Sequence, residues 1–131
     1  MRLHVTAART LDSHTVVVDG PDVSGVAAWR GDGEPPVDAA VDVEIDIADE
    51  VSWGDIVRDS EKIDACVQSA QGSDQLVVRG VVDEVDQLGV LVLNVAGAIV
   101  LIETIGEPPE GVVGSTVVIV TRRASVFPTG I

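Results

Sequence analysis

The stretch Val41–Ile47, which reads Val-Asp-Val-Glu-Ile-Asp-Ile, decides the fold class. Apolar and acidic residues alternate at every step, and successive side chains of a β-strand point to opposite faces of a sheet. The stretch therefore predicts a strand whose Val and Ile residues face a core. Its acids, Asp42, Glu44 and Asp46, are expected to face solvent.

A Gly-Glu-Pro-Pro string precedes this strand at Gly33–Pro36 and occurs again at Gly106–Pro109. Two prolines remove two backbone donors, so neither string can belong to a central strand. Aligning the two strings also aligns several apolar residues of their flanking segments. We interpret the chain as two copies of one β-rich unit, about residues 1–53 and 75–128, joined by a connector at 54–74. The alternative is a meander of similar strands in which two similar loops arose.

The predicted fold is all-β, because Val is abundant and β-branched residues favour strands. The chain of 131 residues suits a single domain, residues 1–131. One unit is too small to close a good barrel alone, so we expect the two units to share a core and cover each other's strand edges. The expected architecture is an antiparallel barrel or paired small barrels of the OB type. Residues 54–74 contain at most one short helix, with Cys66 near its buried side.

The second unit shows a five-strand course, with predicted strands at Leu76–Val85, Gly89–Val95, Gly97–Glu103, Thr116–Thr121 and Ser125–Phe127. In strand order and spacing this course resembles the oligobinding modules of molybdate-binding proteins and transporter ATPases. No sequence motif accompanies the resemblance. It implies a carrier of a small ligand or oxyanion, held where the two units meet by backbone donors near the Gly33 and Gly106 loops.

The formal net charge is -14, and residues 1–74 carry -11 of it. Nucleic acids and anionic membranes bind clustered Lys and Arg, so neither is an expected partner. A basic protein surface, a metal cation or a high-salt cytoplasm would suit the acids, and the alternative is that they only keep the protein soluble. The single cysteine, Cys66, permits no intrachain disulfide and fits a reducing compartment. No apolar run of signal-peptide or membrane-spanning length is present, so a cytoplasmic location is expected.

The sequence provides no candidate catalytic residue and no expected cofactor. A Gly-x-Ser-x-Gly nucleophile motif is absent, and Gly111–Thr116 lacks the lysine of a phosphate-binding loop. His4 and His14 have no Cys or second His at zinc-ligand spacing. A flat row of acids on one strand cannot surround a calcium ion unless the following turn contributes ligands. No metal site is therefore predicted.

The function predicted from these observations is that of a small, acidic, non-enzymatic binding protein of the immunity or adaptor type. It would present its acidic region to a basic protein partner, and electrostatic steering would make association fast and salt-sensitive. A homodimer formed through exposed strand edges is a further expectation. The candidate partner-binding residues are Asp42, Glu44, Asp46, Asp49, Glu50 and Asp55.

Overall fold

A computed structural model describes residues 1–7, 14–58 and 74–129. These residues form ten strands and one 3-10 turn, which confirms the all-β prediction. The strands are β1 Arg2–Ala7, β2 Thr15–Asp19, β3 Val23–Trp29, β4 Ala39–Ile47, β5 Val51–Ser52, β6 Leu76–Val85, β7 Val90–Val95, β8 Ala98–Ile105, β9 Thr116–Thr121 and β10 Ala124–Pro128. The 3-10 turn η1 spans Trp53–Asp55.

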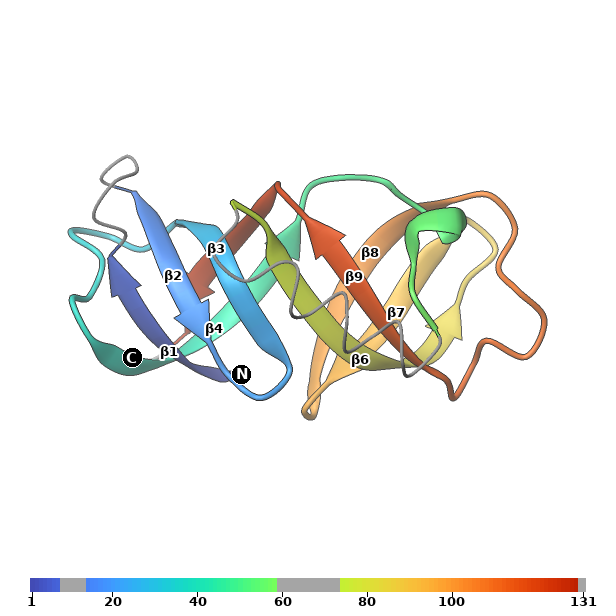
Figure 1. Ribbon diagram of the computed structural model, residues 1–131, viewed down its shortest axis with the longest axis horizontal. Coiled ribbons are helices and arrows are strands. Elements are labelled where there is room, and N and C mark those ends of the chain that lie inside the picture. Colours follow the sequence, from blue (N-terminus) through green and yellow to red (C-terminus); the bar gives the residue numbers. More distant parts are fainter. Residues whose placement is uncertain (8–13, 59–73, 130–131) are drawn as a thin grey trace.

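Five strands close into a barrel at the N-terminal end of the molecule (Figure 1). β1 pairs with β2 and β4, and β2 pairs with β3, all antiparallel. β10 then fills the gap between β4 and β3, antiparallel to β4 and parallel to β3. The predicted barrel is therefore present, and a parallel pair completes it.

The remaining strands lie beside this first barrel and pair with one another in the same order. β6, β7 and β8 form an antiparallel meander, and β9 pairs with β6. The short strand β5 pairs parallel to β8, and a bridge between Val57 and Val118 connects the segment after β5 to β9. β3 also pairs with β6, so all these strands belong to one ten-stranded sheet. We call β1–β4 with β10 the first ring, and β5 with β6–β9 the second ring.

The two rings exchange their fifth strands. β10 follows β9 in the chain but completes the ring of β1–β4 (Figure 1). β5 follows β4 but pairs with β8, within the ring of β6–β9. Each ring thus has three meander strands, a fourth paired with the first, and a fifth paired parallel to the third. Duplication of one ancestral unit stays a hypothesis, and the matching order of pairings supports it.

The Gly-Glu-Pro-Pro strings occupy the same place in each ring, between the third and fourth strands. Gly33 has φ +78° and Gly106 has φ +93°, and neither has an atom within 4 Å of an added Cβ. Both glycines supply a left-handed conformation in an open loop. The predicted turn at Asp86–Gly89 is also present, where the Asp86 carboxylate accepts hydrogen bonds from the backbone N–H groups of Leu88 and Val90.

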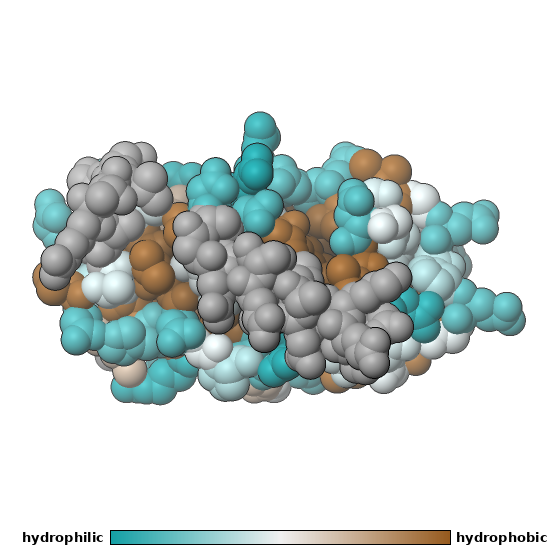
Figure 2. Space-filling view, viewed as in Figure 1, coloured by the Kyte–Doolittle hydropathy of each residue, from teal (hydrophilic) through white to brown (hydrophobic). Residues whose placement is uncertain are grey.

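One continuous apolar core runs through both rings. In β4 the residues Val43, Ile45 and Ile47 are buried and the acids between them are exposed, as the alternation predicted. Each ring contains one buried tryptophan, Trp29 or Trp53, whose indole N–H has no hydrogen-bond partner within the described residues. On the viewed face some apolar side chains also reach the surface among hydrophilic ones (Figure 2).

The connector predicted at 54–74 is described only in part. Its first residues belong to η1, and the Ser52 hydroxyl caps this turn by accepting the backbone N–H of Gly54 at 3.3 Å. Residues 59–73, including Cys66, lie outside the described residues.

Gly25 occupies the joint between the two rings, where β3 passes β6. Its φ is +132°, and a Cβ there would lie 2.0 Å from the backbone oxygen of Gln75 and 2.9 Å from Cα of Leu76. That backbone oxygen also accepts the N–H of Val26 at 3.1 Å. No side chain fits at this position without moving one strand relative to the other.

We expect Gly25→Ala to lower the free energy of unfolding by more than about 3 kcal/mol, because it adds a backbone clash to an unfavourable φ. Gly33→Ala is the matched control, since it also has a positive φ but open space around it, and it should cost about 1 kcal/mol. Urea unfolding of both variants measures the difference. Equal losses would show that the close approach at Gly25 does not hold in solution.

Candidate functional site

The three acids of β4 lie on the outer side of the first barrel. Asp42, Glu44 and Asp46 are all exposed. Asp42 forms an ion pair with Arg2 of β1, with 3.3 Å between its Oδ2 and the guanidinium Nη1. Both partners are exposed, so this pair contributes little to stability.

The other three predicted residues lie beyond the end of β4 and have different surroundings. Asp49 accepts a hydrogen bond from the buried Thr121 hydroxyl at 3.2 Å and pairs with Arg123 at 3.5 Å. Its carboxylate therefore links the segment after β4 to the end of β9 through a hydrogen bond and an ion pair. Glu50 and Asp55 are exposed in that segment and in η1. The six acids therefore do not form one uniform surface.

Glu44 and Asp46 border an open groove of about 500 Å³ that we call the acidic groove. It draws on both rings, because β4 and β10 belong to the first and β8 to the second. Three of its side chains are large, apolar and exposed: Ile99 at 54%, Leu101 at 58% and Phe127 at 41%. Its lining residues are Glu44, Ile45, Asp46, Ile99, Leu101 and Phe127.

Strand register explains why an aromatic ring lies beside these carboxylates. Phe127 is the direct neighbour of Glu44 in the β4–β10 pair, and Ser125 is the neighbour of Asp46. Directly opposed residues of an antiparallel pair have side chains on the same face. The exchanged strand β10 thus places an apolar side chain on the acidic face of β4.

The acidic groove combines apolar contact area with negative charge. Exposed apolar groups rimmed by polar ones are typical of protein interaction surfaces, and carboxylates favour a cationic partner. Among the residues that the structure describes, no group of three or more His, Cys, Asp or Glu side chains is arranged to hold a metal ion.

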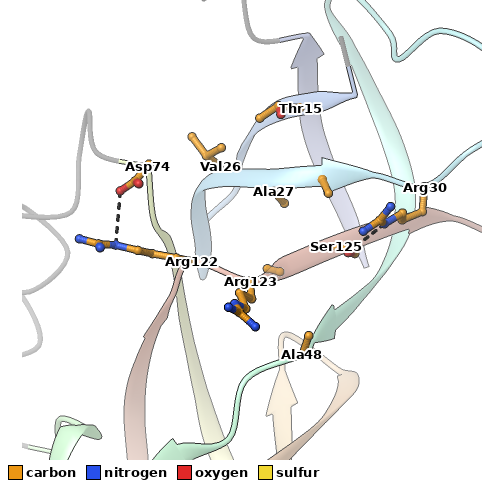
Figure 3. A pocket seen from close by; sticks show the side chains of 11 residues that line it. Thr15, Val26, Ala27, Arg30, Ala48, Asp74, Arg122, Arg123 and Ser125 are labelled. Atoms are coloured by element: carbon orange, nitrogen blue, oxygen red, sulfur yellow. Dashed lines mark hydrogen bonds and ion pairs between the residues drawn. The ribbon is translucent and has the colours of Figure 1, made fainter. Parts of the chain in front are cut away.

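A second groove, of about 590 Å³, has the opposite charge and lies on the outer side of β3 and β10 (Figure 3). We call it the arginine groove. Three arginines line it: Arg30 just after β3, and Arg122 and Arg123 just before β10. The remaining lining residues are Thr15, Val26, Ala27, Ala28, Ala48, Asp74, Ala124 and Ser125.

Each arginine of this groove has a polar partner. Arg122 pairs with Asp74 at 3.5 Å, and Arg30 donates from Nε to the Ser125 hydroxyl at 3.2 Å (Figure 3). Arg123 pairs with Asp49, also at 3.5 Å. Both ion pairs include a largely exposed guanidinium. Solvated pairs of this kind exchange partners at low cost, so an incoming anion can replace the carboxylates.

Sequence reasoning identified Glu44 and Asp46 but missed the residues that complete either groove. Arg30 is distant from Arg122 and Arg123 in the chain, and the parallel pairing of Trp29 with Val126 brings them together. Ile99 and Leu101 belong to an apolar run that predicts a core strand, and nothing in that run indicates that alternate residues are exposed. The Gly33 and Gly106 loops, expected to hold a ligand, line neither groove.

By its fold this chain is an all-β protein in which two rings of strands exchange their fifth strands. It has two grooves of opposite charge, the acidic groove and the arginine groove. Comparisons with protein-family models, curated proteins and solved structures find no match to this chain. Within the described residues, no helix has the length and apolarity required to cross a membrane.

Proposed function

We propose that this protein is a non-enzymatic binding protein, of the immunity or adaptor type, that engages a basic partner through the acidic groove. The observation that carries the proposal is the position of the exposed Ile99, Leu101 and Phe127 side chains beside Glu44 and Asp46. A surface that serves only solubility does not require three large apolar side chains in one groove. Their presence favours a partner that contributes both apolar contact and positive charge.

The charge of the whole chain supports the same partner class. A net charge of -14 attracts a cationic protein over distances comparable to the Debye length, about 8 Å at physiological salt. The overall field raises the rate of encounter, whereas Glu44 and Asp46 determine where the partner docks. Reversing charges in the groove should therefore weaken binding more than reversing the same number of charges elsewhere.

We expect the double substitution Glu44→Lys and Asp46→Lys to weaken binding of a basic probe by roughly tenfold or more, since attraction becomes repulsion at two docking positions. The probe is a short capped peptide in which lysine alternates with valine. Titration calorimetry at low and high salt measures the affinity.

The matched control is Glu107→Lys with Glu110→Lys, two exposed acids in the β8–β9 connection. Either pair of substitutions changes the net charge from -14 to -10. The control should retain most of the affinity. Equal weakening by both pairs would mean that the probe responds only to net charge, and the groove would lose its assigned role.

A second candidate function is that of a carrier for a small oxyanion, and the arginine groove favours it. Three guanidinium groups and the hydroxyl groups of Thr15 and Ser125 line one groove of a protein that otherwise repels anions. Arginine binds phosphate-like groups through paired N–H donors, and a groove open to solvent can admit a hydrated ion.

We expect inorganic phosphate, sulfate or molybdate to raise the thermal unfolding midpoint at constant ionic strength. An anion at about a hundredfold excess over its Kd stabilises the folded chain by about 2.7 kcal/mol. Arg30→Ala should abolish the shift. Arg58→Ala should preserve it, because Arg58 also donates to a serine hydroxyl, that of Ser115, but lies outside the groove. A screen in which none of the three anions moves the midpoint would eliminate this candidate.

A further inference from the structure

The outer edge of β8 is only partly paired. On one side, β7 pairs with β8 from Ala98 to Glu103. On the other side, β5 pairs with Thr104 and Ile105 alone. Within the described residues, no strand pairs with the rest of that second edge.

The hydrogen bonds of the hairpin show which backbone groups point to the open edge. The N–H of Thr104 donates to the carbonyl of Gly89 at 2.9 Å, so Thr104 bonds toward β7. Bonding residues alternate along an antiparallel pair, so Ile102 and Val100 also bond toward β7. The backbone groups of Ile99 and Leu101 therefore point the other way.

Ile99 and Leu101 are also the two β8 residues that line the acidic groove. Their open backbone groups and their exposed side chains thus occur at the same place. An unpaired edge with apolar side chains is a template for another strand, and folded proteins normally cover or charge such an edge.

β4 lies beside β8 in this groove without pairing with it. The N–H of Ala48 donates to the carbonyl of Arg123, and the N–H of Thr129 donates to that of Asp42, each at 2.9 Å. By the same alternation Glu44 and Asp46 bond toward β10, and the backbone of Ile45 points away from it. Ile45 lines the groove although its side chain belongs to the core, which fits a strand edge directed into the groove.

We propose that the acidic groove binds its partner by strand addition. An extended segment pairs with β8 through the backbone groups of Ile99 and Leu101, and presents Lys or Arg at alternate positions near Glu44 and Asp46. Main-chain bonds of this kind give affinity, and alternate side chains give specificity. This inference rests on the proposed binding of a basic partner.

Charge selects this occupant over a second copy of the chain. Each copy carries a net charge of -14, and Glu44, Asp46 and Glu103 are exposed around the open edge. Two such edges repel each other, whereas a lysine-bearing strand is attracted. The acids thus protect the edge from self-pairing and leave it available to a cationic segment.

The test uses the full chain and three peptides. The first is the capped peptide of alternating lysine and valine. The second has the same sequence with its valine amide nitrogens methylated, and a third, with the lysine amides methylated, covers the other pairing edge. Methylation removes the backbone donors of one edge and leaves every side chain and charge unchanged. Hydrogen exchange of the protein amides, read by NMR, is measured with and without each peptide.

With the unmodified peptide we expect exchange at the amides of Ile99 and Leu101 to slow by roughly tenfold, because each gains a hydrogen-bond partner. The neighbouring amides of Val100 and Ile102 already bond to β7 and serve as internal controls. At least one methylated peptide should bind at least about tenfold more weakly, since one edge of the added strand loses its donors.

The outcomes separate the two proposals. Tight binding of all three peptides with unchanged exchange at Ile99 and Leu101 would overturn strand addition and leave the basic partner in place. No binding of any peptide would overturn both. Protection of the same two amides without peptide, increasing with protein concentration, would assign the edge to a second copy and contradict the inference.

Discussion

The parallel pairing of β10 with β3 is the interaction on which the rest of the structure depends. It places Val126 beside Trp29, closes the first ring and buries Val126 completely. Only a short turn joins β9 of the second ring to β10 of the first. The two rings therefore cannot separate unless β10 leaves the first ring, which opens that ring. A second connection runs in the opposite direction: the chain leaves the first ring after β4, and the next strand, β5, pairs with β8 of the second ring. Each ring is therefore incomplete without the other, and one core serves both.

Both grooves result from this exchange. β10 brings Phe127 beside Glu44 on one side and Ser125 beside Ala28 on the other. The turn that leads into it places Arg122 and Arg123 at the groove that Arg30 also lines. A chain with a strongly negative net charge thus acquires one local concentration of arginines next to an acidic surface. The position of these side chains, more than the net charge, determines which ligands each face can bind.

Much of the fold could be predicted from local pattern. The alternation in Val41–Ile47 specified a half-buried strand, and Asp86–Gly89 specified a hairpin turn. The partners of β5 and β10 could not be predicted, because a parallel pair joins segments distant in the chain and no local signal encodes the choice. β5 has only two residues, too few to show any periodicity. The grooves were missed for the same reason, since Arg30 shares one groove with Arg123, and Leu101 shares the other with Phe127, only through those pairings. In addition, an apolar run such as Ala98–Ile102 does not reveal which residues are exposed.

The central claim is that strand exchange makes the two rings a single cooperative unit. Trp29 reports on the first ring and Trp53 on the second, and replacing either by Phe removes no hydrogen bond within the described residues. Urea unfolding of Trp29→Phe and Trp53→Phe, followed by the remaining tryptophan, tests the claim most directly. If the rings are interdependent, each variant shows one transition, and adding Val126→Ala lowers both midpoints by about the same amount. A second ring that keeps its midpoint when Val126 is truncated would contradict the claim that the two rings unfold as one unit.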